Sequence, residues 1–233
     1  MARKTTTTPP SEPPPRAASP TKRPARKANT STTATPGSAT EPTDTRERLI
    51  EAAIALAQEE GLLAVGLREV ARRAGVTHSA PYRHFADRRE LIVAAAERGF
   101  HELFAYVVER QRETTDDPLD RFWALGVAYF MFATTRPGLF RLMFSREASR
   151  AEQLRPAEGA VFSMCVGAIA AAQGAGFVVH GDVQKMALVA WSSMHGLAQL
   201  HLDGLTTWLG LADDPEHLAR EISSRVYVGF ALR

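Results

Sequence analysis

The stretch Leu67–Phe85, LREVARRAGVTHSAPYRHF, decides the fold of this chain. Its first part places apolar side chains on one helical face, at the i, i+3 and i+4 positions: Leu67, Val70 and Ala71. Gly75 can adopt the left-handed backbone conformation that turns the chain sharply, and Thr77 is a suitable N-cap for a second helix. Two short helices joined in this way form a helix-turn-helix, whose second helix lies in the major groove of DNA. The segment therefore predicts DNA binding.

Helical periodicity continues on both sides of this segment. A helix is expected from Asp44, which has a Glu three residues later as in a capping box, to Gly61. Its apolar face holds Leu49, Ala52, Ala53, Leu56 and Ala57. Asp87, again with a Glu three residues later, begins a longer helix, and Phe85 before it is expected to close the core. Residues 44–104 are thus predicted to form a DNA-binding domain of three helices, which a fourth helix joins to the rest.

The remaining strong signals are also helical. The expected elements are a helix from residue 117 to about residue 135, a short apolar turn over 139–144, and helices over about 157–172, 182–202 and 214–230. The sequence has no two-residue hairpin turn and no alternating strand pattern, so the predicted fold class is all-α. Residues 105–233 are predicted to form a second helical domain.

Residues 1–43 differ in composition from the rest of the chain. They consist almost wholly of Thr, Pro, Ser, Ala, Lys and Arg, so they are predicted to form a disordered tail that buries too little apolar surface to fold. Seven basic and two acidic residues give the tail a charge of +5, which leaves −3 for residues 44–233, since the whole chain carries +2. The tail is either a solubilising segment or a basic arm that attracts phosphates.

The sequence favours a cytoplasmic protein. Its beginning lacks the apolar core of a signal peptide, and the single cysteine, Cys165, cannot form an intramolecular disulfide, which suits a reducing compartment. The uncharged run Ala160–Val179 is long enough to span a bilayer. Its many alanines, its glycines and Gln173 favour a buried helix instead, so we expect no membrane partner.

Three successive segments of the sequence resemble the tetracycline-repressor (TetR) family of bacterial transcriptional regulators. They are RERLIEAAIALAQEEG at residues 46–61, LREVARRAGVTHSAPYRHF at 67–85 and ADRRELIVAAA at 86–96. The sequence YRHF at residues 82–85 matches the aromatic pattern at the end of the family's recognition helix. WSSMHGLA at 191–198 resembles the signature of a subgroup named for a Trp-His-Gly (WHG) motif, and PGLFRLMF at 137–144 fits the same subgroup.

Two positions depart from the family pattern. Gly66 stands where the family usually has a Ser or Thr that caps the first helix of the motif, which weakens the case for one phosphate contact. Ser79-Ala80-Pro81 replaces a commoner sequence of a small residue, Thr and Leu. The base readout of better-known members therefore does not transfer to this chain.

The resemblance implies a regulator that binds a palindromic DNA operator as a homodimer and is released by a small apolar effector, with repression as the default. It implies no enzymatic activity, cofactor or metal. The residues expected to bind DNA are Arg68, Thr77, His78, Ser79, Ala80, Tyr82, Arg83, His84 and Arg89. The start of the recognition helix, Thr77–Ala80, is expected to face base edges, and the family assigns Tyr82 and His84 to the sugar–phosphate backbone.

Each DNA-binding assignment has a simpler alternative. Tyr82 could merely pack, and His78 and His84 could be solvated histidines. Arg72 and Arg73 are expected to form a solvated face.

Two further sets of residues carry predictions in the C-terminal half. An effector pocket, mostly apolar with few polar groups, is expected from Trp123, Tyr129, Phe130, Phe140, Phe144, Met164, Trp191, Met194 and His195. Ordinary core packing is the alternative for each of them. The resemblance implies that residues 105–233 form a regulatory and dimerisation domain whose last two long helices pair between subunits, so a dimer face is expected from a stripe on the last helix, Leu218, Ile222 and Val226. An internal core helix would show the same periodicity.

Two other classes of protein were weighed. An enzyme would have to use the grouping His180, Asp182, His195, His201 and Asp203. Two of these histidines, His195 and His201, are six residues apart and point to opposite sides of a helix, which argues against a shared metal. The second alternative is a helical protein that binds a protein partner instead of DNA. Steep loss of DNA affinity with salt would distinguish a DNA-binding protein from it.

Overall fold

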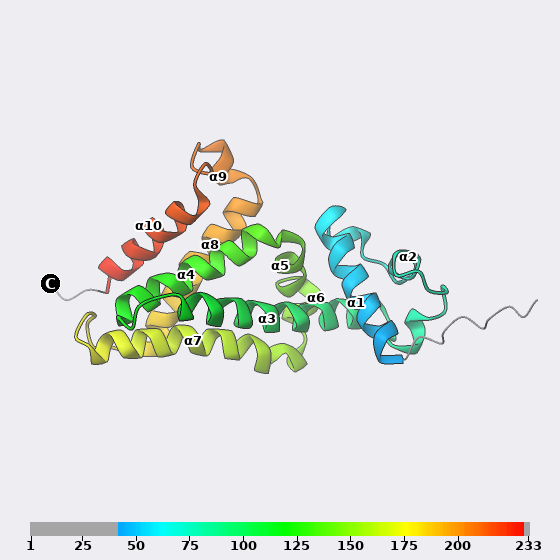
Figure 1. Cartoon of the computed structure of the whole chain (residues 1–233), viewed down its shortest axis with the longest axis horizontal. Helices are drawn as coiled ribbons and strands as arrows, with labels where there is room; N and C mark the ends of the chain where they lie inside the picture. The colour runs from blue at the N-terminus through cyan, green and yellow to red at the C-terminus, as the bar shows by residue number, and fades with distance from the viewer. Residues whose placement is uncertain (1–41, 231–233) are drawn as a thin grey trace, which may run out of the picture. The chain divides into compact units, whose positions relative to one another are not determined.

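A computed structural model describes residues 42–230 of the chain, and every regular element in that range is a helix (Figure 1). The predicted all-α fold is therefore confirmed. The tail predicted over residues 1–43 lies outside the described residues except for its last two. In chain order, with η for 3₁₀ helices, the elements are α1 Pro42–Glu59, η1 Leu62–Ala64, α2 Leu67–Arg73, η2 Pro81–Arg83, α3 Arg88–Arg112, α4 Pro118–Thr135, α5 Pro137–Met143, α6 Arg146–Ser149, η3 Glu152–Leu154, α7 Arg155–Gly174, α8 Val183–Leu202, α9 Leu205–Trp208 and α10 Pro215–Val228.

Aspartates begin four of these helices, as the sequence predicts. Each accepts a hydrogen bond from a backbone N–H of the first turn: Asp87 before α3, Asp117 before α4, Asp182 before α8 and Asp214 before α10. At α3, the Glu90 carboxylate reaches back as in a capping box, but it accepts the N–H of Ala86, one residue before the cap, at 2.6 Å. The corresponding prediction at Asp44 is wrong. Helix α1 begins two residues earlier, at Pro42, so Asp44 lies inside the first turn.

Helices α1 and α2 and the first turns of α3 enclose one hydrophobic core, and we call this unit the head. Its largest buried members are Leu49, Ile50, Leu56, Val65, Val70, Phe85, Leu91 and Ile92. Phe85 is only 1% exposed and shares the core with Ile50, as predicted. The guanidinium of Arg46 lies 5.5 Å from the centre of the Phe85 ring, a cation–π contact on the outer side of the core.

A second core lies between the rest of α3 and the helices α4, α5, α7, α8 and α10, and we call this unit the body. Its core is rich in aromatic side chains, Phe100, Tyr129, Phe130, Phe132 and Phe140. Helix α3 has 25 residues and contributes Leu91 to the head core and Leu103 to the body core. The same helix therefore runs through both units, so that the head and the body share one backbone element.

Helix α7 contains most of the run that raised the question of a membrane span. Within residues 42–230, one segment, Glu152–Gly174, has the length and composition of a membrane-crossing helix. One face of α7 is buried in the body through Val161, Cys165 and Ile169. Helix α7 packs against α3, α4 and α8, and burial along one stripe is typical of a core helix.

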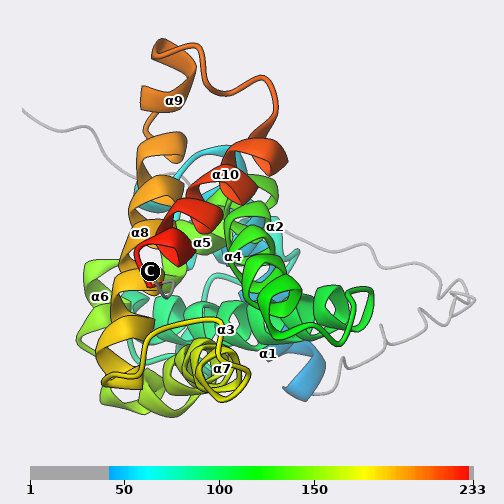
Figure 2. The ribbon, with the colours of Figure 1, turned by 90° about the vertical axis from the view of Figure 1, so that its left-hand side faces the viewer.

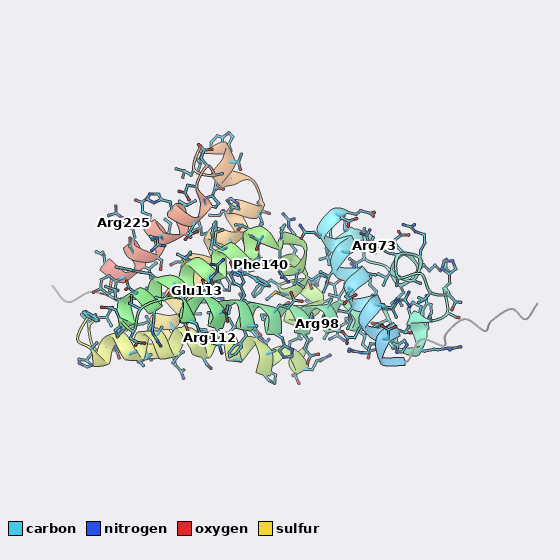
Figure 3. All side chains as sticks on the ribbon, viewed as in Figure 1. Arg73, Arg98, Arg112, Glu113, Phe140 and Arg225 are labelled. Atoms are coloured by element: carbon cyan, nitrogen blue, oxygen red, sulfur yellow. The ribbon has the colours of Figure 1, made fainter. Side chains whose placement is uncertain are left out.

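The segment expected as an apolar turn over residues 139–144 is instead a helix, α5. Pro137 occupies its first helical position, where a missing N–H breaks no hydrogen bond. The side chains of α5 then divide between the two cores, because Leu142 joins the head core while Leu139 and Phe140 join the body core. Figure 3 labels Phe140 inside the body and Arg73 on the head. Helix α5 is therefore a second element that both units share.

Close approach of α5 to α1 depends on Gly138. A Cβ atom at this position would lie 2.3 Å from the backbone nitrogen of Gln58 and 2.4 Å from its Cα. The amide N–H of Gly138 donates to Oε1 of Gln58 at 2.8 Å, which holds the two helices in register. The missing side chain is what permits this contact between head and body.

Replacing Gly138 with Ala is expected to lower the free energy of unfolding by about 1–3 kcal/mol, because the new methyl group would overlap backbone atoms of α1 that cannot rotate away. Urea unfolding followed by circular dichroism measures the change. Gly159→Ala in α7 is the matched control, since nothing lies within 4 Å of that position. In a helix interior Ala is favoured over Gly by about 0.5–1 kcal/mol. Equal stabilities of the two variants would contradict the α1–α5 contact.

Candidate DNA interface and effector cavity

The first helix of the motif, α2, and its turn form as the sequence predicts. Gly66 precedes α2 without a side-chain cap, and the helix ends at Arg73. Gly75 has a φ of 66°, in the left-handed region that favours glycine. The amide of Val76 closes the turn by donating to the carbonyl of Ala71 at 3.0 Å. The chain therefore leaves α2 sharply and directs the following residues to the surface of the head.

The second helix of the motif differs from the prediction. Residues 77–80 form a turn, and only Pro81–Arg83 are helical, as the 3₁₀ helix η2. Pro81 is the fifth residue from Thr77, and its nitrogen carries no hydrogen to donate to the Thr77 carbonyl. That carbonyl instead accepts the N–H of Ala80, three residues on, at 2.9 Å. The predicted α-helix over Thr77–Phe85 is therefore wrong, because proline occupies the position of the first required α-helical bond.

The residues predicted to bind DNA nevertheless share one exposed region of the head. Tyr82 is 55% exposed, although its neighbours Pro81 and Phe85 are buried. Ala80 and His84 are half-buried, and the other predicted residues are exposed: Arg68, Thr77, His78, Ser79, Arg83 and Arg89. We call the nine predicted residues the head surface. No other part of the described chain covers it.

The arginines near this surface fall into two groups. Arg72 donates from Nε to Glu69 Oε1 at 2.9 Å, and Arg73 is paired with Glu59. The hydrogen bond from Arg72 lowers the pKa of Glu69 below its ordinary value, so this pair stays ionised. None of the ion pairs found between residues 42 and 230 involves the arginines of the head surface, Arg68, Arg83 and Arg89. Three cations thus remain available to an external anion.

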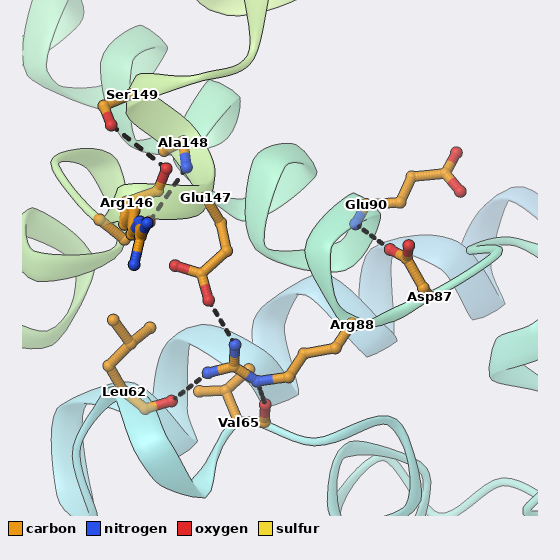
Figure 4. A network of polar contacts seen from close by, with 10 residues as sticks. Leu62, Val65, Asp87, Arg88, Glu90, Arg146, Glu147, Ala148 and Ser149 are labelled. Atoms are coloured by element: carbon orange, nitrogen blue, oxygen red, sulfur yellow. Dashed lines mark hydrogen bonds and ion pairs between the residues drawn. The ribbon is translucent and has the colours of Figure 1, made fainter.

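Arg88 is an important residue that sequence reasoning missed. Its guanidinium donates to the carbonyls of Leu62, at 2.9 Å, and Val65, at 2.6 Å, and to Oε1 of Glu147 in α6 at 2.6 Å (Figure 4). The pKa of Glu147 lies below its ordinary value because of its own backbone amide at the start of α6, and also because of Arg88. The sequence places Arg88 beside Arg89 without any signal that one turns inward and the other outward.

The body contains a small apolar cavity between α3, α4, α7, α8 and α10. Its volume is about 20 Å³, and its walls include Val107, Phe122, Leu125, Gly126, Tyr129, Val161, Met164, Cys165, Ala190, Trp191, Met194, Ser223 and Val226. None of these residues carries a formal charge at neutral pH. Burial raises the pKa of the Cys165 thiol to about 12, so it lines the wall as a neutral group. Four of the predicted pocket residues lie here, namely Tyr129, Met164, Trp191 and Met194.

The other predicted pocket residues lie around the cavity and do not line it. Phe140, Phe144 and His195 form an aromatic cluster, in which the rings of Phe144 and His195 have centroids 4.5 Å apart. Phe130 packs on His201, with ring centroids 5.2 Å apart. Trp123 lies on the far side of α4, in a separate polar pocket of about 390 Å³, and its buried Nε1 has no hydrogen-bond partner.

Tyr129 joins the cavity to this aromatic cluster. Its hydroxyl lies 2.8 Å from Nδ1 of His195, and its ring packs on Trp191 at a centroid distance of 5.2 Å. Burial lowers the pKa of His195 and raises that of Tyr129, so both groups are neutral near pH 7. Tyr129 is therefore part of both the cavity wall and the contacts of His195.

The stripe predicted as the dimer face is half-buried at all three positions, Leu218, Ile222 and Val226. Ile222 packs on the body core, and Val226 packs on the cluster around Phe122 and also lines the cavity. The role of these residues in a dimer stays a prediction. Large apolar side chains are exposed on the neighbouring helix α8 instead: Leu188 (56%), Val189 (51%) and Leu200 (47%). Figure 2 shows α8 and α10 on the same side of the body, where they pack against each other.

The residues that would have served an enzyme are separated in the structure. His195 is bonded to Tyr129, His201 lies 2.7 Å from the hydroxyl of Thr206, and Asp182 caps α8. Over residues 42–230, no group of three or more His, Cys, Asp and Glu side chains is arranged to hold a metal ion.

A three-helix head with a glycine turn, followed by a helical body, defines a class of helix-turn-helix DNA-binding regulators. Residues 49–95 match the family model described as bacterial regulatory proteins, tetR family. Residues 122–226 match the model described as tetracyclin repressor-like, C-terminal domain. The chain belongs to the TetR family of transcriptional regulators. Its resemblance to the WHG subgroup stays a prediction.

Known proteins similar to this chain agree with this assignment. The HTH-type transcriptional activator FasR of Mycolicibacterium smegmatis is 33% identical over 102 residues, which are 44% of this chain and 46% of FasR. The chain thus matches less than half the length of that relative. A protein with unknown function from Rhodococcus sp. RHA1 has a solved structure that is 32% identical, with a TM-score of 0.70, over 81% of this chain and 96% of that one. A tetR-family regulatory protein from Rhodococcus RHA1 shares the fold at 19% identity, with a TM-score of 0.62, over 81% and 98% of the two chains.

His195→Gln is expected to weaken the dependence of stability on pH. Because burial lowers the pKa of His195, the unfolded chain takes up this proton more readily than the folded chain. The free energy of unfolding of the unmodified protein therefore falls as the pH drops below about 6.5. Glutamine cannot titrate but can still bond to the Tyr129 hydroxyl, so the variant lacks this part of the loss.

Urea unfolding at about pH 7.5 and about pH 5.5 measures the effect. His180→Gln, at an exposed position, is the matched control. A pH dependence in His195→Gln as steep as that of the unmodified protein would show that this imidazole is not held neutral by burial.

Proposed function

We propose that this protein is a transcriptional repressor that binds a palindromic DNA operator as a homodimer and is released by a small apolar effector. The observation that carries the proposal is the head surface, where Arg68, Arg83 and Arg89 are exposed and form no ion pair with any residue from 42 to 230. Since the described body is not strongly basic, attraction to phosphates has to come from such a local patch. A regulator of this kind works where the genome is, in the cytoplasm.

The head surface can divide the work between phosphates and bases. Arg68 at the start of α2 and Arg89 at the start of α3 are both exposed, and we assign them to phosphates that flank the groove. Thr77 and Ser79 present hydroxyls 3.3 Å apart, which can donate to or accept from base edges. The exposed Tyr82 is assigned to the sugar–phosphate backbone, to which its hydroxyl can donate. Because Thr77–Arg83 is a turn and a short 3₁₀ helix, the base contacts come from few residues in each subunit.

Because each subunit contacts few bases, specific binding to an operator requires a second subunit. Two half-sites add their binding energies when the two heads are one helical turn of DNA, or a multiple of it, apart. We propose that α8 and α10 form the dimer face and that the exposed Leu188, Val189 and Leu200 on α8 pack against the same residues of a second copy. Between them on this face lies Gly196, where a Cβ atom would meet no neighbour within 4 Å. Such a face is self-complementary about a twofold axis, as a symmetric dimer requires.

The effector is proposed to be uncharged. Pockets for small molecules usually measure about 300–1,000 Å³, so a cavity of about 20 Å³ has to expand when a molecule enters. The polar side-chain groups of its wall residues are all uncharged, namely the hydroxyls of Tyr129 and Ser223, the thiol of Cys165 and the indole N–H of Trp191. A carboxylate or ammonium group would be buried there without a counter-charge, which costs several kcal/mol.

The test of the function is DNA binding by the purified protein. Sequencing of genomic fragments that the protein retains, followed by footprinting, should recover a palindromic site whose affinity falls steeply as salt rises. Tyr82→Phe is then expected to lower operator affinity about tenfold or more, because each subunit loses a hydrogen bond to a phosphate.

The matched control is Tyr106→Phe, which removes a hydroxyl from the C-terminal part of α3. It should bind the operator like the unmodified protein. Unchanged affinity in Tyr82→Phe would refute the assigned role of this tyrosine, and the absence of any retained fragment would refute the function itself.

The dimer face has its own test. Leu188→Asp is expected to convert the dimer into a monomer, because a carboxylate would be buried in an apolar interface. Sedimentation velocity at several protein concentrations measures the molecular mass. Leu63→Asp is the matched control, since Leu63 is 96% exposed but lies on the head. A dimer that survives Leu188→Asp would place the interface elsewhere.

A further inference from the structure

The guanidinium of Arg88 links three segments that are far apart in the sequence. It lies in the first turn of α3, binds the two carbonyls of Leu62 and Val65 in the connection that leads into α2, and pairs with Glu147 of α6 (Figure 4). Its side chain is 36% exposed and that of Glu147 is 29% exposed, so the pair is partly shielded from water. A planar guanidinium holds its acceptors in fixed directions. The position of α6 is thereby tied to the entrance of the helix-turn-helix.

A continuous series of contacts leads from Glu147 back to the cavity. Tyr129 lines the cavity, and its hydroxyl lies 2.8 Å from Nδ1 of His195. The His195 ring packs edge-on against Phe144 at a centroid distance of 4.5 Å. Phe144 is followed directly by Ser145, the N-cap of α6, and Glu147 lies in the first turn of that helix. Three side-chain contacts and one short stretch of backbone therefore connect the cavity wall to the connection before α2.

We propose that the ion pair between Glu147 and Arg88 is the contact through which an occupant of the cavity changes the position of the helix-turn-helix. This inference rests on the proposed function, since it needs both an effector and an operator. Glu147 touches neither of them in this scheme. It acts through Arg88 and is therefore a positioning residue.

The packing around this series explains why a displacement travels along it. The cavity of about 20 Å³ is too small for a ligand, so entry of a ligand has to displace residues of its wall, which includes Tyr129 and Trp191. Protein interiors are close-packed, and a displaced side chain moves its neighbours more readily than it compresses them. Phe144 touches Phe100 and Phe140 as well as His195, so it moves together with the start of α6. Glu147 then either moves Arg88 with it or loses its ion pair with Arg88. In both cases the hydrogen bonds from Arg88 to the carbonyls of Leu62 and Val65 change.

Because the effector is unidentified, the test fills the cavity with a larger side chain in place of a ligand. Ala190 lines the cavity and is 5% exposed, so Ala190→Leu adds three carbon atoms to a space that cannot hold them. This variant is expected to lower the affinity for the operator about 5–150-fold, the usual range for linked sites. In a Glu147→Ala background, the same substitution is expected to lower the affinity by less than about twofold, because the displacement no longer reaches Arg88.

The matched control background is Asp116→Ala, which removes an ion pair of the same 2.6 Å length, that between Asp116 and Arg121. Ala190→Leu should keep its full effect there. Equal effects of Ala190→Leu in the Glu147→Ala background and in the unmodified protein would overturn the inference, because independent sites multiply. If the unmodified protein binds no operator, the proposed function fails instead, and the two failures are thus distinguishable.

A second measurement needs neither DNA nor the cavity variant. Hydrogen exchange followed by mass spectrometry should show faster exchange of the α2 amides, residues 67–73, in Glu147→Ala than in the unmodified protein. If Glu147 only stabilised α6, exchange would rise in that helix and remain unchanged in α2, which would also overturn the inference. Circular dichroism verifies that each variant is folded.

Discussion

The close contact between α5 and α1 is the constraint on which the rest of the structure depends. Gly138 allows α5 to touch the backbone of α1 at Gln58, and Leu142 of the same helix enters the head core. Because Leu139 and Phe140 belong to the body core, one short helix is a member of both units. Helix α3 adds the second shared element. The head is therefore held by the body at two places, and its orientation follows the internal packing of the body.

In this arrangement, the residues that form the exposed surface of the head differ from those that attach the head to the body. Arg68 and Arg89 are exposed and form no ion pair within the described residues, whereas Arg88, the immediate neighbour of Arg89, faces inward to backbone carbonyls and Glu147. Successive residues on a helix point about 100° apart, so two adjacent arginines can serve opposite purposes. The same first turn of α3 thus contributes one cation to the exposed surface and one to the link with the body.

The sequence predicted those features that depend on local chemistry. Four of the five aspartate caps, the left-handed Gly75 and the buried face of α1 each follow from a few neighbouring residues, and the structure has them, whereas Asp44 lies inside α1. The prediction of a second α-helix after Thr77 was wrong because Pro81, four residues after the expected N-cap, lacks the N–H that the first α-helical hydrogen bond requires. This cause is local, since it follows from the spacing of Thr77 and Pro81 alone.

Other features depend on partners distant in the sequence and could not be predicted from it. Periodicity identifies an apolar stripe on α10 but does not tell whether Ile222 meets its own core or a second copy. In the same way, nothing near Arg88 indicates that a glutamate 59 residues later will pair with it. The same reason applies to the aromatic residues that were predicted to line the pocket. The hydrophobicity of Phe140 predicts that it lies in a core, but the path of α5 decides that it lies beside the cavity and does not line it.

The small size of the cavity links affinity for the effector to the position of the head. A ligand can bind only to the fraction of molecules in which the cavity is open, so its apparent affinity is reduced by that fraction. If opening also displaces the link through Glu147, the conformation that admits the effector is the one that fits the operator poorly. Linkage then requires the operator to weaken effector binding by the same factor as the effector weakens operator binding. In the proposed mechanism, a tightly packed core with little free volume opposes joint binding of effector and operator, because the effector can enter only by displacing side chains whose contacts lead to the head.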